Sequence, residues 1–126
     1  MISIYKIIVV RDKKLKERWN ILQKKISYQF NNGELIDLDG IIYLVGIQEL
    51  GFTKRKFKKD EKLNLMHIGV SKLLSQYGYY EFHFYDEDGW PHYIVKDQLP
   101  NLTSGEQKLL MKQAIVNYFL EQGYIS

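Results

Sequence analysis

The stretch at 77–97, YGYYEFHFYDEDGWPHYIVKD, constrains the fold of this chain more than any other segment. It places an Asp88-Gly89 pair between two runs of aromatic and β-branched residues. Such a pair favours a tight type I′ turn, because glycine readily accepts the positive φ angle that this turn requires. The stretch therefore predicts an antiparallel β-hairpin with strands at 79–85 and 90–96.

A two-residue turn at Asp88-Gly89 also sets the register of the two strands. It places Glu87 opposite Trp90, with an edge position for Pro91, whose missing N–H then points away from the partner strand. Because side chains alternate along a strand, the two faces separate into an apolar and a mixed set. The apolar face is Phe82, Phe84, Tyr93 and Val95; the mixed face is Glu81, His83, Tyr85, His92, Ile94 and Lys96. An isolated hairpin is marginally stable, so the apolar face should pack on helices.

Four segments carry helical signals. Asp12 is a suitable cap for a helix to about Phe30, with an apolar stripe at three- and four-residue steps and a stop at Asn31-Asn32-Gly33. The run IIYLVGIQEL, between Asp37 or Asp39 and Gly51, is apolar on nearly all sides and is either a helix or a buried strand; the caps favour a helix. The third helix is about 61–76, begun by Asp60, with a stripe of Leu63, Met66, Val70, Leu73 and Tyr77 that Leu65, Ile68 and Leu74 broaden, so it should be mostly buried. The fourth is about 104–122, begun by the capping box Thr103-Ser104-Gly105-Glu106.

These elements predict an α+β fold of about four helices packed on one hairpin. Residues 2–10 are rich in isoleucine and valine, and either an additional N-terminal strand or the start of a helix fits so short a run. A shared core is expected from residues of all these elements: Trp19, Leu22, Ile26, Leu44, Met66, Val70, Leu73, Phe82, Phe84, Ile115 and Phe119.

The length of 126 residues predicts a single domain, 1–126. The chain contains no cysteine, which excludes disulfides and thiolate metal sites. No apolar run is long enough to span a membrane, and the N-terminus lacks the pattern of a signal peptide, so a cytoplasmic protein without a membrane partner is expected.

Charge is distributed unevenly along the chain. Residues 1–62 hold 14 basic and 8 acidic residues, a net +6, whereas residues 63–126 hold 4 and 7, a net −3. Residues 52–59, FTKRKFKK, form a basic connector between two predicted helices. It could contact nucleic-acid phosphates through Lys54, Arg55, Lys56, Lys58 and Lys59. The acidic hairpin tip, Asp86-Glu87-Asp88, would repel phosphates, so a nucleic-acid- or ribosome-associated role is an alternative that the sequence does not favour.

Candidate catalytic and metal-binding residues are few. His67 lies on an apolar helix, where a satisfied core histidine is the more common situation, and a catalytic pairing with Glu49 is the alternative. In the predicted register His83 and His92 are diagonal neighbours that could bind a metal together with Glu81 or Glu87. No known metal-ligand spacing is present, and we predict neither a metal nor another cofactor.

The end of the hairpin is the main candidate for contact with a partner. Trp90 beside Pro91 either anchors a partner protein or folds back on the core, and tryptophan is the residue type most enriched at interface hot spots. Tyr85, Asp88 and His92 surround it in sequence. We predict these four residues as a partner-binding surface, for an unidentified protein or a second copy of the chain.

The same region carries a resemblance to a group of small uncharacterised bacterial proteins. The shared pieces are G-x-Q-E-L-G at Gly46–Gly51, L-M-H-I at Leu65–Ile68, Y-G-Y-Y-E at Tyr77–Glu81 and D-G-W-P-H at Asp88–His92. The resemblance covers about 40–100 and implies no activity, substrate or cofactor. It directs attention to Gln48, Glu49, His67, Asp88, Trp90 and His92.

The sequence therefore predicts a non-enzymatic protein-interaction or accessory module. Nucleic-acid binding by the connector is the first alternative. A small enzyme or metal protein using Glu49, His67, His83 or His92 is the second.

Overall fold

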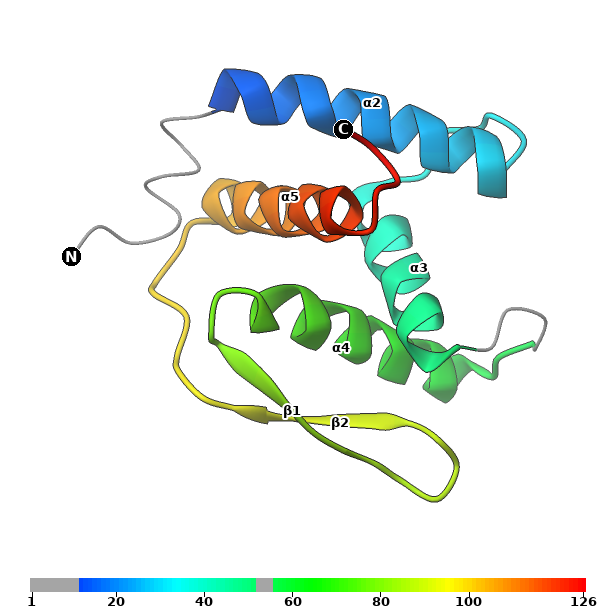
Figure 1. The fold of residues 1–126 in the computed structure, drawn as a ribbon, viewed down its shortest axis with the longest axis vertical. Helices are drawn as coiled ribbons and strands as arrows, with labels where there is room; N and C mark the ends of the chain where they lie inside the picture. The colour runs from blue at the N-terminus through cyan, green and yellow to red at the C-terminus, as the bar shows by residue number, and fades with distance from the viewer. Residues whose placement is uncertain (1–11, 52–55) are drawn as a thin grey trace. The chain divides into compact units, whose positions relative to one another are not determined.

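The computed structural model describes residues 12–51 and 56–126. Within them the chain forms four α-helices and one two-stranded antiparallel sheet, as the α+β prediction requires (Figure 1). The chain separates into two compact units: α2 and α5 belong to residues 1–38 and 100–126, and α3, α4 and the hairpin belong to residues 39–99, with α3 beginning at the boundary. The interpretations of residues 2–10 as strand or helix fall outside the described residues.

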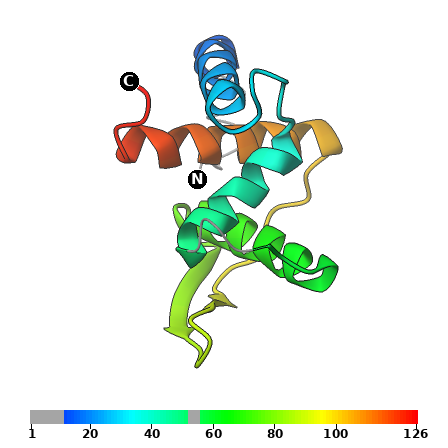
Figure 2. The same cartoon turned by 90° about the vertical axis from the view of Figure 1, so that its right-hand side faces the viewer.

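The first unit is built from α2 (Asp12–Phe30) and α5 (Ser104–Glu121), whose apolar stripes pack on each other. The helices cross, so that α2 is seen nearly end-on where α5 lies lengthwise (Figure 2). Leu15, Trp19, Leu22 and Ile26 of the predicted stripe are buried, but Phe30 in the last turn is 57% exposed. From α5, the buried apolar residues are Leu110, Ala114, Ile115, Val116, Tyr118 and Phe119.

The end of α2 and the start of α5 follow their sequence signals. α2 stops where Asn32 and Gly33 take positive φ angles of 53° and 89°. At the start of α5, Thr103 Oγ1 accepts a hydrogen bond from Glu106 N at 3.2 Å, and Glu106 Oε1 accepts one from Thr103 N at 3.0 Å, which completes the predicted capping box. The C-terminal Tyr124 then returns to α2, where its hydroxyl donates to Gln29 Oε1.

The second unit places α3 (Leu38–Leu50) across α4 (Lys59–Ser75). Two glycines allow the contact: a Cβ on Gly46 would lie 2.0 Å from Leu65 O, and one on Gly69 would lie 2.3 Å from Ile42 O. Any side chain would therefore push the two backbones apart. Gly51, with φ of 83°, ends α3 at the predicted position.

This crossing decides which side of α4 is buried, and the predicted stripe was partly wrong. Leu63 is 61% exposed, and Met66 and Val70 are half-buried. The buried apolar side chains are Leu73 of the stripe and the three residues predicted to broaden it, Leu65, Ile68 and Leu74. Because α4 is apolar on several sides, its sequence allows more than one stripe, and the close approach at Gly69 selects this one.

The hairpin consists of β1 (Tyr80–Tyr85) and β2 (Pro91–Val95), within a residue of the predicted strands. Its register differs from the prediction for two reasons. First, Asp86 N donates to Trp90 O and Gly89 N donates to Asp86 O, both at 2.9 Å, so Glu87, Asp88 and Gly89 form the loop instead of Asp88-Gly89 alone. With Gly89 at φ of 85°, this is the three-residue loop with a glycine bulge.

The second reason is an irregularity in β1 between Phe82 and Phe84, which leaves His83 without an opposite residue. The longer loop and the irregularity in β1 each shift the strand pairing by one residue. Phe82 therefore lies opposite Tyr93, and Phe84 opposite His92, in place of the predicted partners Val95 and Tyr93. Since opposite residues share a face, Phe82 and Phe84 lie on different faces of the hairpin.

The predicted core was therefore right for the first unit and wrong for the hairpin. Trp19, Leu22, Ile26, Leu73, Ile115 and Phe119 are buried, and Leu44, Met66 and Val70 are half-buried. Phe82 and Phe84 are exposed, at 44% and 46%. The hairpin instead contributes Pro91, which is buried, and half-buried Trp90 and Tyr93.

Candidate functional site

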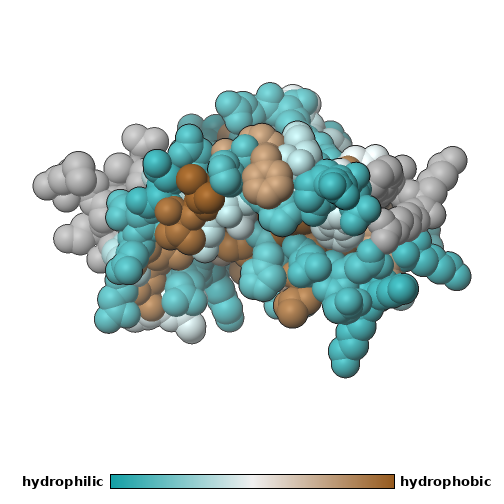
Figure 3. Space-filling view, turned by 90° about the horizontal axis from the view of Figure 1, so that it is seen from below, coloured by the Kyte–Doolittle hydropathy of each residue, from teal (hydrophilic) through white to brown (hydrophobic). Residues whose placement is uncertain are grey.

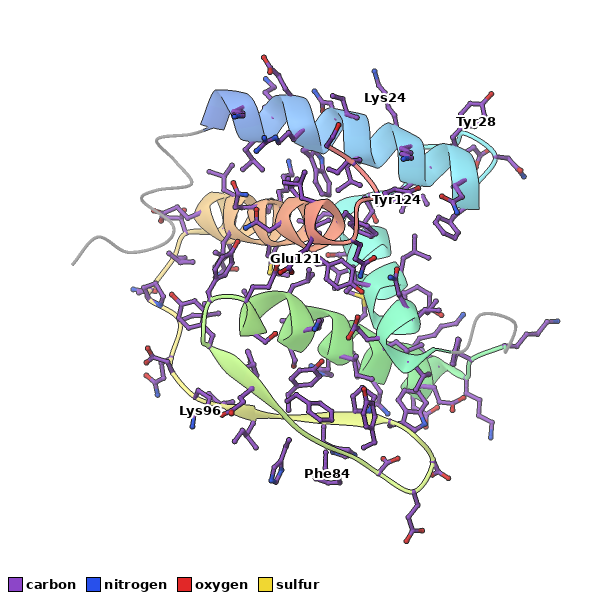
Figure 4. All side chains as sticks on the ribbon, viewed as in Figure 1. Lys24, Tyr28, Phe84, Lys96, Glu121 and Tyr124 are labelled. Atoms are coloured by element: carbon purple, nitrogen blue, oxygen red, sulfur yellow. The ribbon has the colours of Figure 1, made fainter. Side chains whose placement is uncertain are left out.

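The outer face of the hairpin, which we define as Glu81, Phe84, His92, Ile94 and Lys96, combines apolar and charged groups. Glu81 lies opposite Ile94 and Phe84 lies opposite His92, while His92 and Ile94 share a face because they are two residues apart. The Phe84 side chain projects away from α4 (Figure 4). Phe84 is 46% exposed and Ile94 is 39% exposed, so two large apolar side chains lie at the surface.

Aromatic contacts order this face. The rings of Phe84 and His92 are stacked, with parallel planes and centroids 4.6 Å apart. Lys96 Nζ lies 3.3 Å from Glu81 Oε2 and closes the other end of the face with an ion pair. The result is an apolar centre bordered by charges, which is the usual anatomy of a protein interface.

The inner face of the hairpin packs on the second unit's own core. Trp90 and Tyr93 contact a cluster of Leu50, Leu65 and Ile68. Trp90 therefore has the folded-back position, one of the two positions that the sequence left open. Its role in binding a partner stays a prediction, which has to be separated experimentally from its role in packing.

Asp86 organises the turn through both carboxylate oxygens. Oδ1 accepts hydrogen bonds from Asp88 N and Trp90 N, each at 3.0 Å, and Oδ2 lies 2.8 Å from His92 Nε2. The hydrogen bond to His92, followed by that from Trp90, holds the pKa of the Asp86 carboxyl below its usual value. One carboxylate thus fixes the loop and orients the imidazole that stacks on Phe84.

A cleft of 430 Å³ separates the turn from α4. His67 lines it and is exposed, so the expectation of a satisfied core histidine was wrong. It faces the cleft together with residues of the turn, which brings together four of the residues that the resemblance indicates. The lining residues are Glu61, Asn64, His67, Ile68, Asp86, Asp88, Trp90, Pro91 and His92.

Glu49 has other partners on this unit. Its Oε1 lies 3.8 Å from Lys72 Nζ, which supplies the cationic neighbour that a carboxylate near a helix C-terminus needs. Burial, followed by the negative charges of Glu49 and Tyr85, raises the pKa of Tyr93 to about 12. Glu49 therefore pairs with Lys72 and acts on Tyr93 through its charge, and its catalytic pairing with His67 stays a prediction.

The two histidines considered as metal ligands have separate environments. His92 binds Asp86, whereas the ring of His83 contacts that of Phe84 with centroids 5.1 Å apart. Over residues 12–51 and 56–126, no group of three or more histidines and carboxylates has the arrangement of a metal site. The register on which their diagonal placement depended was wrong.

The basic connector is described only in part. Lys56, Lys58 and Lys59 are exposed just before and at the start of α4, and Lys54 and Arg55 lie outside the described residues. No described helix is both long and apolar enough to cross a membrane.

Sequence reasoning missed Phe84 as a surface residue, because it placed Phe84 on the apolar face, whereas it placed Ile94 on the mixed face. The pair Asp86 and Gly89 is a signal that could have predicted the change of register, because it suits a three-residue loop as well as a two-residue turn. The bulge at His83 has no comparable signal. No protein-family model, curated protein or solved structure matches the chain.

Proposed function

We propose that this chain is a protein-interaction module that contacts its partner through the outer face of the hairpin. The observation that carries the proposal is the exposure of Phe84 and Ile94 on an ordered strand pair, next to an imidazole held by Asp86. Burying exposed apolar side chains against another surface is favourable in free energy. Because these side chains are already held in one geometry, less conformational entropy is lost on binding.

Apolar side chains are also exposed on the opposite face of the hairpin. Phe82, Tyr85 and Val95, at 44%, 62% and 65%, pair with Tyr93, Pro91 and Tyr80, so they are not part of the outer face. Figure 3, seen from the hairpin side, shows brown apolar patches among the teal polar groups. The proposed contact is restricted to Phe84 and Ile94 on the outer face.

The charges on the hairpin indicate the chemistry of the partner. Glu87 and Asp88 are exposed in the loop, and Asp86 lies beside them, so the tip is acidic. A complementary partner presents an apolar pocket for Phe84 and Ile94, with lysine or arginine next to it to face the loop. Charge complementarity of this type guides association and register more than it adds affinity.

Site-specific photocrosslinking tests the proposal. A photoreactive residue at position 84 should give one discrete protein adduct in lysate of the source cell, because Phe84 lies at the centre of the proposed contact. The matched control is position 28, since Tyr28 is an aromatic residue of the first unit that is 81% exposed. The Phe84 adduct should disappear in an Ile94→Asp variant that keeps its melting temperature.

Two results would remove the proposal. One is the same set of adducts at positions 84 and 28, which would indicate nonspecific contact. The other is a Phe84 adduct that survives Ile94→Asp, because the outer face would then not be the binding surface.

A further inference from the structure

The first unit contains a cleft that is not part of the proposed protein-interaction surface. It has a volume of 580 Å³, within the range typical of small-molecule sites. Its lining residues belong to α2, to α5 and to the segment after α2 up to Leu38, the first residue of α3. They are Leu15, Lys16, Trp19, Asn20, Gln23, Asp37, Leu38, Lys108, Leu109 and Lys112.

The charge of this lining is strongly positive for so small a space. Among the described residues that line it, three lysines stand against one carboxylate, that of Asp37, which leaves a net charge of +2. Lys16 and Lys108 are exposed, and Lys112 is half-buried. Lys112 Nζ lies 5.4 Å from the centre of the Trp19 ring, a cation–π distance that holds the ammonium group at the cleft wall.

The remaining wall is suited to an organic ligand and not to a simple ion alone. Leu38 and Leu109, both half-buried, provide apolar surface beside the buried Trp19 and Leu15, and Asn20 and Gln23 provide amide groups. Gln23 Nε2 donates to Ile36 O at 2.8 Å, which fixes the orientation of that amide. The cleft therefore combines a cationic side, an apolar side and polar groups that can orient a ligand.

We infer that this cleft binds a small phosphate monoester that carries a planar or apolar group. A phosphate monoester has a charge of about −1.5 to −2 at neutral pH, which matches the +2 of the lining. Lysine binds phosphate as a flexible point charge, so three lysines can converge on one phosphate without a rigid cradle. The organic part of the ligand lies against the half-buried Leu38 and Leu109, next to Trp19.

Calorimetry with four probes tests this inference on the complete chain. Adenosine monophosphate should bind saturably, with an affinity that falls as salt concentration rises. Adenosine, which lacks the phosphate, and inorganic phosphate, which lacks the planar group, should bind at least about tenfold more weakly, since each loses one of the two recognised parts. A single-stranded oligonucleotide, the other common source of phosphate, should bind more weakly than the monoester.

Matched variants locate the binding. Lys16→Ala and Lys108→Ala should each weaken adenosine monophosphate binding by about tenfold, because each removes one charge-assisted contact. Lys24→Ala removes the same charge from an exposed position of α2 outside the cleft and should change nothing (Figure 4). The NMR signal of the Trp19 indole, distinguished from the other by Trp90→Phe, should shift on titration.

The inference fails under any of three outcomes. Adenosine that binds as tightly as its monophosphate would show an apolar cleft without phosphate recognition. An equal loss in Lys24→Ala would show diffuse surface attraction. Binding of the oligonucleotide, but not of the monophosphate, would assign the lysines to nucleic acid. None of these outcomes depends on the hairpin, so this test is independent of the proposed function.

Discussion

The α2–α5 unit and the hairpin unit use their apolar residues in opposite ways. In the first, the amphipathic stripe of the sequence is the buried surface: Leu22 and Ile115 are fully buried. In the hairpin, the residues with the clearest apolar alternation, Phe82 and Phe84, are exposed at 44% and 46%. The comparison shows that periodicity identified the buried face of α2, which is polar on its other sides, but was less reliable on the short strands and on α4, which is apolar on several sides.

The largest expected difference between the two regions is in stability. Leu22→Ala should lower the free energy of unfolding by about 2–5 kcal/mol, because it removes a fully buried side chain and leaves a cavity. Phe84→Ala should cost less than about 1 kcal/mol, although it removes more atoms, because its ring is already half in water. Chemical denaturation measures both values. A cost for Phe84→Ala that equals that of Leu22→Ala would show that the hairpin face is covered.

A second test concerns the α3–α4 crossing, which has no counterpart in the sequence pattern. Gly46→Ala should destabilise the protein by about 3 kcal/mol, since the added methyl group would meet the backbone carbonyl of Leu65 and overpacking costs this much. Gly105→Ala is the control, because its Cβ would meet no atom within 4 Å. Thermal unfolding that shows Gly46→Ala to be neutral would contradict the crossing.

Trp90 should show an intermediate effect that separates packing from binding. Trp90→Ala should cost about 2 kcal/mol, below the range for fully buried aromatic residues, because the ring covers the Leu50, Leu65 and Ile68 cluster but is only half-buried. Trp90→Phe should restore most of that stability. If the partner crosslink at position 84 is lost in Trp90→Phe while stability is kept, Trp90 also contacts the partner.

The smallest expected effect is a pH dependence confined to the hairpin turn. The folded pKa of Asp86 lies below 3.8, so its stabilisation of the turn is present in full above pH 3.8 and is lost as pH falls through the folded pKa. NMR titration of the Asp86 carboxyl should give this lowered pKa. His92→Ala should raise it, because the hydrogen bond to His92 is its main cause. A folded pKa at or above 3.8 would contradict the described turn.

The candidate site could be predicted only in part. The sequence pointed to the hairpin end, and His67, Asp88, Trp90 and His92 line one cleft. It could not show that Asp86 links the loop to His92, because a carboxylate in a turn has several backbone and side-chain partners within reach. The ion pair of Glu49 with Lys72 was likewise not evident, since it depends on how α3 crosses α4.

The sequence by itself determined where α2 and α3 end and where α5 begins, but the predicted cap Asp60 lies inside α4, whose N-cap is Lys58. Asn32, Gly33, Gly51 and the Thr103–Glu106 box act through local φ angles and local hydrogen bonds, and each worked as its type requires. Only the tertiary structure decided which apolar side chains are buried in α4 and in the hairpin. Burial there depends on a backbone contact at Gly46 and Gly69 and on a one-residue bulge at His83, and a shift of one residue moves a side chain to the other face of a strand.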